Sequence, residues 1–416
     1  MRPTRCSRLT DAAQGQRLYL LCWVAYASAY VGRYNYSAVM GAITAEGTLR
    51  LGMAGAVSTG YFVCYAIGQI VFGLLSPYVS PYLLIALGLS GSGLCNLGMS
   101  TAAPSWMIAF WAANGVFQAM IWPPIVRLFA ESMPLERQKQ ACVSINSTTP
   151  AGTLAAYAVS AALLAFSRWN TVFFFCGILL LAIAGFFWAG TASLRSATHF
   201  LPQERPVHAE KRRSFLPAAG LGALLIPVIL HGGLKDGVTS WVPSMLQSSF
   251  ALRPTFSAAI SMILPVVNLS GAYLSGWLDA HYFHNELKTA AALFSVAALC
   301  LLALPAAIQC SLSLAVLLLA VTTASMLGVN TMFINVLPVK AGRSSGAAAL
   351  SGALNAITYL GAAASTWGIG RTAEQSGWHA VFRLWIGMAI LSLLVTALLA
   401  NRWAQFLRSS EERNCK

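Results

Sequence analysis

Residues 191–215, TASLRSATHFLPQERPVHAEKRRSF, form the only long polar stretch of a 416-residue chain. The sequence on either side consists of apolar runs separated by short polar breaks, and a run of about 20 apolar residues can cross a bilayer as a helix. Six runs precede the stretch and six follow it, at roughly 17–41, 52–76, 82–100, 105–130, 141–166, 170–190, 216–248, 254–279, 288–308, 311–337, 344–370 and 379–403. The stretch is therefore expected to be a loop that joins two halves, 1–190 and 216–416.

The composition excludes most soluble classes of protein. Hydrophobic residues make up 57% of the chain and charged residues only 9%, whereas about a quarter of the residues in soluble domains are charged. So few charges exclude a soluble enzyme, a disordered protein and a nucleic-acid-binding domain. No strand-like alternation interrupts the runs, and helices satisfy their own backbone hydrogen bonds in lipid. We expect an all-α membrane protein with twelve transmembrane helices embedded in the lipid bilayer.

The basic residues predict the orientation of the chain. With the N-terminus in the cytoplasm, 19 of the 26 Lys and Arg residues lie on the cytoplasmic side, 5 lie on the other side, and Arg33 and Lys235 lie inside spans. Because cytoplasmic loops are rich in Lys and Arg, both termini are expected in the cytoplasm. The first apolar run has no small-residue cleavage site after it, which predicts a retained span rather than a signal peptide.

The two halves share a short motif. Residues 145–152, INSTTPAG, and residues 354–361, LNAITYLG, both read apolar-Asn-x-x-Thr-x-x-Gly, and each belongs to the fifth run of its half. A parallel repeat of six plus six helices is the plan of the major facilitator fold, in which substrate binds near the midplane between the halves. We therefore expect this fold, with a central cavity.

The two cations inside spans indicate the chemistry of that cavity. Arg33 lies about 22 Å along the first span, too deep to reach the interface, and Lys235 lies at similar depth in the seventh span, the counterpart of the first. A buried cation is costly unless it faces a cavity or a partner. Two cations in one cavity repel each other unless an anion lies between them, so the pair predicts a small anionic substrate. The alternative for Arg33 is a structural bond to neighbouring helix carbonyls.

Aromatic residues accompany the cations. Tyr26 and Tyr30 precede Arg33 by seven and three residues, so the three share one helix face. Further candidates in other spans are Tyr65, Trp122 and Tyr359. For any single aromatic residue, packing in the core or at the membrane interface is the alternative.

Two titratable residues adjoin Lys235. Asp236 is the only carboxylate well inside a span, and His231 lies one turn earlier. Neighbouring helical residues point about 100° apart, so Asp236 need not face the Lys235 ammonium. Asp236 could compensate a nearby positive charge, or either residue could carry a coupled proton. Compensation is favoured, because a carboxylate lowers the cost of the empty cavity.

Enzymatic motifs are absent from the sequence. It contains no Walker loop, HExxH motif or nucleophile elbow, and the nine cysteines include no CxxC pair. Neither an enzyme, a metal site, a cofactor nor ATP-driven transport is expected.

The fourth run carries a family resemblance. Residues 114–127, NGVFQAMIWPPIVR, followed by Glu136-Arg137, resemble the NGxxQGxGWPPxxR…ER signature of the organophosphate:phosphate antiporters, the glycerol-3-phosphate and hexose-phosphate transporter family. The resemblance implies exchange of a phosphorylated metabolite for inorganic phosphate by alternating access. The family's substrate-binding residues then fall on Arg33, Lys235, Tyr26, Tyr30, Trp122 and Tyr359.

The chain departs from the family at three positions. Lys235 replaces an arginine, which keeps the charge but loses the planar fork that binds two oxygens. The family's lysine in span two falls on Gln69 and its histidine in span five on Thr149. Both remain candidate substrate contacts.

Because the site has fewer positive groups, a proton-coupled symporter of an organic carboxylate stays open. A non-transporting sugar-phosphate sensor is a third possibility. By analogy with the family, we expect a monomer in a bacterial inner membrane.

Overall fold

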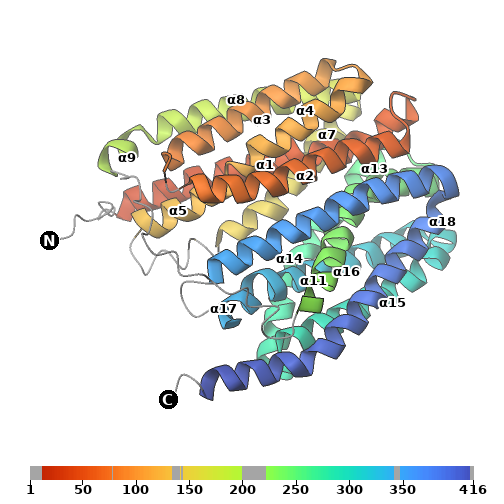
Figure 1. The fold of residues 1–416 in the computed structure, drawn as a ribbon. Coiled ribbons are helices and arrows are strands. Elements are labelled where there is room, and N and C mark those ends of the chain that lie inside the picture. The colour runs from red at the N-terminus through yellow and green to blue at the C-terminus, as the bar shows by residue number, and fades with distance from the viewer. Residues whose placement is uncertain are drawn as a thin grey trace. The chain divides into compact units, whose positions relative to one another are not determined.

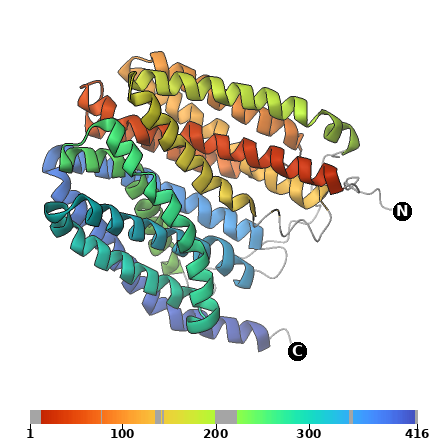
Figure 2. The ribbon, with the colours of Figure 1, turned by 180° about the vertical axis from the view of Figure 1, so that it is seen from behind.

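The structure is a computed structural model that describes residues 12–76, 78–133, 141, 144–198, 222–341 and 347–412. All secondary structure among these residues is helical, and helices account for most of the described part of each predicted apolar run (Figures 1 and 2). The predicted all-α class is therefore confirmed. Residues 199–215 of the predicted central loop, the first six residues of the predicted run 216–248, and the Glu136-Arg137 pair lie outside the described residues.

Contacts between residues divide the chain into two compact units. Unit 1 comprises Met1–Leu49, Gly60–Arg205 and Arg253–Met262, and unit 2 comprises Arg50–Thr59, Pro206–Leu252 and Ile263–Lys416. Each unit thus includes a short segment from the other half of the sequence. The segment Arg50–Thr59 belongs to unit 2 because it bonds there: Gly52 N–H donates to Glu374 Oε2 at 2.7 Å, and Thr59 Oγ1 donates to the Ala363 carbonyl at 2.8 Å.

Unit 1 is a bundle of long helices. Its elements are α1 (Ala12–Ala45), most of α2 (Leu51–Leu75), α3 (Pro81–Thr101), α4 (Pro104–Ala119), α5 (Trp122–Ser132), η1 (Ile145–Ser147), α7 (Thr148–Leu164), α8 (Trp169–Gly190), α9 (Ala192–Ala197) and α13 (Pro254–Ile260). Helix α1 packs against α7 and α8, and α3 packs against α4 and α8 (Figure 1).

Proline sets several helix starts in unit 1. Helices α3, α4 and α13 begin at a proline, where the missing N–H is not needed and the fixed φ favours the first turn. The predicted run 105–130 is divided into α4 and α5 by a turn at Met120 and Ile121. Pro123 and Pro124 follow directly in the first turn of α5, and because proline has no N–H to donate, they cannot continue the hydrogen bonds of α4.

Unit 2 alternates α-helices with wider π-helical turns. Its elements are η2 (Gly222–Leu224), α11 (Leu225–Gly232), the π turn η3 (Gly233–Gly237), α12 (Val238–Phe250), α14 (Ile263–Leu278), the π turn η4 (Asp279–Phe283), α15 (Glu286–Cys310), α16 (Leu312–Asn330), the π turn η5 (Thr331–Val336), α17 (Leu337–Ala341) and α18 (Ala347–Glu412). Within α18, Gly377 adopts φ = 73°, which separates the two runs predicted at 344–370 and 379–403. Glycine suits this position because it has no Cβ to clash.

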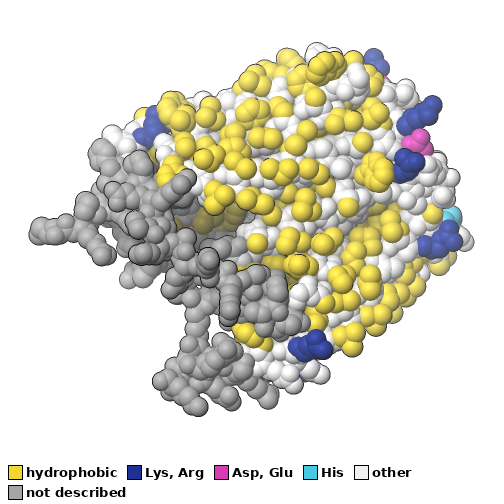
Figure 3. Space-filling model, viewed as in Figure 1, with side chains coloured by type: hydrophobic (Ala, Val, Ile, Leu, Met, Phe, Trp, Pro, Cys, Tyr) yellow, Lys and Arg dark blue, Asp and Glu magenta, His cyan; other side chains and the backbone are white. Residues whose placement is uncertain are grey.

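Apolar length supports a multi-pass membrane protein. Seven segments of the described residues are long and apolar enough to cross a membrane: Leu51–Leu75, Pro81–Thr101, Trp169–Gly190, Pro254–Phe283, Glu286–Cys310, Leu312–Lys340 and Leu350–Leu407. The last of these covers two predicted spans. The described parts of the spans predicted at 17–41, 105–130, 141–166 and 216–248 are mainly helical but do not meet the same measure of length and apolarity. Hydrophobic side chains cover much of the described surface in view (Figure 3), as expected for helices that face lipid.

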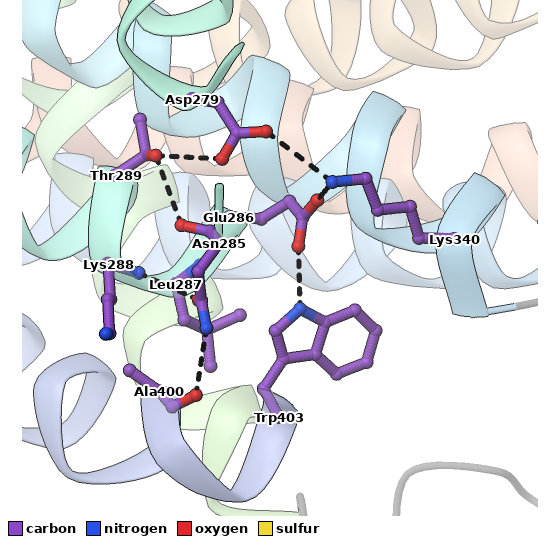
Figure 4. A network of polar contacts seen from close by, with 9 residues as sticks. All are labelled: Asp279, Asn285, Glu286, Leu287, Lys288, Thr289, Lys340, Ala400 and Trp403. Carbon is purple, nitrogen blue, oxygen red and sulfur yellow. Dashed lines mark hydrogen bonds and ion pairs between the residues drawn. The ribbon is translucent and has the colours of Figure 1, made fainter. Parts of the chain in front are cut away.

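A polar network joins four elements of unit 2 (Figure 4). The Glu286 side chain is fully buried, accepts from Trp403 Nε1 at 2.7 Å and pairs with Lys340. Lys340 Nζ also lies 3.6 Å from Asp279 Oδ2, and Asp279 Oδ1 accepts from Thr289 Oγ1 at 3.0 Å. Because a buried carboxylate is costly without partners, this network anchors η4, α15, α17 and α18 to one another.

Helices α11 and α18 approach closely at two glycines. A Cβ added to Gly232 would lie 1.9 Å from the Thr358 carbonyl oxygen, and one added to Gly361 would lie 1.9 Å from the Ile229 carbonyl oxygen. Both close contacts are with backbone, which cannot rotate away as a side chain could. The helices can therefore pack at this distance only with glycine at both positions.

We expect Gly361→Ala to lower the midpoint of thermal unfolding, because overpacking costs about 1–3 kcal/mol. Gly352→Ala on the same helix is the matched control, since an added Cβ there meets nothing within 4 Å. The midpoints of the two purified variants are measured by thermal unfolding in detergent. Equal midpoints for the two variants would contradict the close approach of α11 and α18.

Candidate substrate-binding site

Arg33 lies in α1 with only 7% of its surface exposed, and aromatic rings surround its guanidinium. Five ring centres lie 5.0 to 5.8 Å from Arg33 Cζ, within the range of cation–π attraction. The rings belong to Tyr30 and Tyr34 of α1 and to Tyr61, Phe62 and Tyr65 of α2. Unit 1 thus holds a buried cation in an apolar, electron-rich shell.

A small pocket of about 10 Å³ opens beside Arg33, a volume that holds about one water molecule. Its lining consists of Tyr26, Ala29, Tyr30, Arg33, Tyr65 and Gln118. The hydroxyls of Tyr26 and Tyr30 lie 3.3 Å apart, and the Tyr26 ring stacks on Trp122 with ring centres 5.0 Å apart. The structure therefore brings together Arg33 and three of the predicted tyrosines, with Trp122 behind one of them.

Gln118 was not among the predicted site residues, although it lies within the signature stretch. Its Nε2 donates to the Ala29 carbonyl at 2.9 Å and to Ser92 Oγ at 3.1 Å, and its Oε1 accepts from the Tyr61 hydroxyl at 2.9 Å. The signal that points to it is its spacing of four residues from Asn114, which places both amides on one face of α4.

Gln69 and Thr149 do not line the pocket. Gln69 follows Tyr65 by one turn on α2 and is half-buried, and its Nε2 is buried with no hydrogen-bond partner in the described parts of the chain. Thr149 is half-buried in the first turn of α7, where its carbonyl accepts from Thr153 Oγ1 at 2.7 Å. Gln69 therefore has a side-chain donor that a ligand could use.

In unit 2, Lys235 and Asp236 lie in the π turn η3 and form an ion pair. Lys235 Nζ is 3.0 Å from Asp236 Oδ2, and the two side chains are 17% and 4% exposed. Lys235 Nζ also lies 5.4 Å from the centre of the Tyr359 ring. Asp236 does face the Lys235 ammonium, and both residues lie where the seventh span is locally a π turn rather than an α-helix.

His231, at the end of α11, is fully buried and faces α16. Its Nε2 lies 3.0 Å from the Met326 carbonyl, so Nε2 carries the hydrogen of that bond. The ring also contacts Phe333 edge to face, with centres 6.2 Å apart. The Nδ1 atom has no hydrogen-bond partner among the described residues.

The arginine that ends the WPPxxR part of the signature, Arg127, has a structural contact. Arg127 Nη1 donates to the carbonyls of Ser76 and Val79, the latter at 3.0 Å, and its Nε pairs with Glu131 Oε1 at 3.0 Å. It therefore holds the connection between α2 and α3. This part of the signature stabilises unit 1 away from the pocket.

The model of the Major Facilitator Superfamily matches residues 22–366. The chain therefore belongs to the Major Facilitator Superfamily, and the expected fold is confirmed.

The curated relatives confirm the resemblance drawn from the signature. The glycerol-3-phosphate transporter of Bacillus subtilis is 22% identical over 67% of this chain and 68% of its own length. The membrane sensor protein UhpC of Salmonella typhimurium is 21% identical over 91% of this chain and 90% of its own length. A probable hexose phosphate transport protein of Chlamydia trachomatis is 28% identical, over 27% of this chain and 25% of its own length.

Solved structures share the fold. A bacterial homologue of the human lysosomal transporter Spinster, in an inward-facing and occupied conformation, matches 96% of this chain and 98% of its own with a TM-score of 0.77 and 13% identity. The peptide transporter POT in complex with sulfate matches 96% and 97% with a TM-score of 0.75 and 12% identity. The curated relatives named above are transporters and one sensor, which supports a role other than that of an enzyme.

Proposed function

We propose that the chain is a secondary transporter that exchanges a phosphorylated metabolite for inorganic phosphate by alternating access. The observation that carries the proposal is Arg33, a buried guanidinium beside a pocket and surrounded by five aromatic rings. The names of the Bacillus glycerol-3-phosphate transporter and the chlamydial hexose phosphate proteins support a phosphate ester as substrate. We further propose a monomer in a bacterial inner membrane, with both termini in the cytoplasm.

Arg33 would bind the phosphoryl group. A guanidinium can donate two parallel hydrogen bonds to phosphate oxygens, and such charge-assisted bonds are about twice as strong as neutral ones. The surrounding rings exclude water, which strengthens an electrostatic contact further. The hydroxyls of Tyr26, Tyr30 and Tyr65 would donate to remaining oxygens, and the Gln69 amide and Trp122 would contact the rest of the substrate.

Lys235 would supply the second positive charge. Its ammonium is already paired with Asp236, so an arriving anion shares the ammonium with that carboxylate. In this proposal Asp236 compensates the charge of the substrate-free site, and Tyr359 packs beside the ammonium. Thr149 remains a weaker candidate contact.

A proton-coupled symporter of an organic carboxylate is the second candidate, and the burial of Asp236 next to Lys235 favours it. Protonation of Asp236 would free the ammonium for a substrate carboxylate and would carry one proton with each substrate. His231 is less suited to this role, because its Nε2 is engaged by the Met326 carbonyl. The likeness to the Salmonella sensor keeps ligand sensing without transport as a third candidate.

Liposomes loaded with radiolabelled phosphate test the proposal. Purified protein is reconstituted, a panel of external sugar phosphates, glycerol phosphates and sugar acids is added, and efflux of the label is recorded, with Arg33→Ala as the control. We expect efflux driven by at least one phosphate ester and no efflux from the variant. If no ester drives efflux but a sugar acid accumulates under an imposed pH gradient, the symporter replaces the exchanger. Binding of an ester without any flux would indicate a sensor.

A further inference from the structure

Four buried amides join helices α1, α3 and α4 in unit 1. We name Asn35, Asn96, Asn114 and Gln118 the amide cluster; all are between 0% and 4% exposed. In an apolar interior, an amide without hydrogen bonds costs several kcal/mol. The contacts that these side chains make are therefore expected to be strongly maintained.

Three amide donors of the cluster bond to the backbone of α1 next to Arg33. The Gly32 carbonyl accepts from Asn96 Nδ2 at 3.2 Å and from Asn114 Nδ2 at 3.0 Å. The Ala29 carbonyl, one turn earlier, accepts from Gln118 Nε2 at 2.9 Å. The bonds originate on α3 and α4, so two neighbouring helices hold the segment of α1 from which the Arg33 side chain extends.

The amide oxygens of the cluster are occupied as well, which fixes the orientation of each amide. Asn96 Oδ1 accepts from Asn35 Nδ2 at 2.7 Å, and Asn114 Oδ1 accepts from Ser92 Oγ at 2.5 Å. Gln118 Oε1 accepts from the hydroxyl of Tyr61, whose ring is one of those around the Arg33 guanidinium. If any of these three amides were turned over, its oxygen would face a backbone carbonyl oxygen, and two acceptors cannot form a hydrogen bond. The cluster therefore has one satisfied arrangement.

We propose that Asn96, Asn114 and Gln118 are positioning residues for the binding arginine. They fix the α1 backbone at Ala29 and Gly32, and through Tyr61 they also fix a wall of the shell around Arg33. The guanidinium is then held in place before an anion arrives, which removes an ordering cost from binding. This inference rests on the proposed function of Arg33 as an anion ligand.

The proposal gives the Asn-Gly-x-x-Gln part of the signature a physical role. Asn114 and Gln118 lie one turn apart on the face of α4 that meets α1. Between them, a Cβ added to Gly115 would lie 2.3 Å from the Tyr61 carbonyl oxygen, so only glycine lets α2 approach. In this proposal the Asn-Gly-x-x-Gln residues position the binding arginine and the Tyr61 ring. If they served helix packing alone, their amides would not need to bond to the Ala29 and Gly32 carbonyls.

The test compares two substitutions of the same kind. Asn114→Leu removes an amide that bonds to the Gly32 carbonyl, and Asn170→Leu removes an amide whose Nδ2 bonds to the Ser100 carbonyl at 2.8 Å, between α8 and α3. The affinity for phosphate is measured by the rise in unfolding temperature that added inorganic phosphate produces. The KM and the maximal rate of phosphate exchange are measured in liposomes. Gln118→Met is a second variant in case Asn114→Leu does not fold.

We expect Asn114→Leu or Gln118→Met to weaken phosphate binding and raise KM at least tenfold, with the maximal rate changed less than threefold. Asn170→Leu should bind phosphate as the unchanged protein does, even if its unfolding temperature falls equally. A fall in unfolding temperature with no change in phosphate affinity in Asn114→Leu and Gln118→Met would overturn the positioning role and leave the proposed function intact. If neither phosphate nor any phosphate ester binds the unchanged protein, the proposed function itself fails and the positioning role with it.

Discussion

Phosphate exchange should fall about a hundredfold when Arg33 is replaced with lysine, although the positive charge is kept. A lysine ammonium is a point charge that cannot donate two parallel bonds to one phosphate. Loss of one hydrogen bond to a charged group costs about 1.5–3 kcal/mol, and each 1.4 kcal/mol is a factor of about ten in affinity. The five rings also surround the broad guanidinium at 5.0 to 5.8 Å, so a smaller head group would leave part of that shell empty.

The control is Arg195→Lys. Arg195 also lies over an aromatic ring, with Cζ 3.7 Å from the centre of Trp188, but it follows α8 and does not line the pocket. Exchange of external phosphate for labelled internal phosphate measures both variants, and Arg195→Lys should leave the rate unchanged. Exchange by Arg33→Lys at the unchanged rate would show that charge alone is sufficient, and the role of a bidentate guanidinium would be lost.

The second prediction is that Asp236→Asn lowers the stability of the substrate-free protein but increases its response to phosphate. Removing one partner of a buried ion pair costs about 3–5 kcal/mol, because the remaining charge is left uncompensated. An anion can then replace the lost carboxylate beside Lys235, and it no longer meets a competing negative charge. We expect about tenfold tighter phosphate binding, and exchange should persist because an exchanger needs no titrating residue.

Asp279→Asn is the matched control, since Asp279 also pairs with a lysine of unit 2, Lys340, in a separate network. Its stability should fall without any change in phosphate affinity. Unfolding temperatures with and without phosphate, followed by exchange in liposomes, measure both variants. Should Asp236→Asn lose accumulation under a pH gradient while keeping counterflow, Asp236 carries a proton and the symporter is the better description.

The helical fold could be predicted from the sequence because apolar length is a local property. Helix accounts for most of the described part of each predicted run, and the break at Gly377 falls between the last two runs. The π turns were not predicted, because an extra residue per turn depends on packing against neighbouring helices rather than on local sequence. Helical spacing left open whether Asp236 faces Lys235, and the pair that the structure shows lies in one of these turns.

The predicted site was incomplete for a similar reason. Tyr30 could be placed beside Arg33 from spacing on one helix, and the structure shows that contact. Tyr61 and Phe62 were missed because their positions depend on how α2 is rotated against α1, which no spacing within either helix determines. Gln118 lies within the signature, but its role could not be predicted, since that role depends on a carbonyl of another helix.

The amide cluster also bears on how the protein is assembled in the membrane. Helices α1, α3 and α4 each cover a predicted membrane span and carry at least one of the amides Asn35, Asn96, Asn114 and Gln118. An amide that faces hydrocarbon is costly, and a hydrogen bond between transmembrane helices contributes about 0.6–2 kcal/mol. These three helices are therefore expected to associate early after insertion. The side chains that place the binding arginine would then also direct the order in which unit 1 folds.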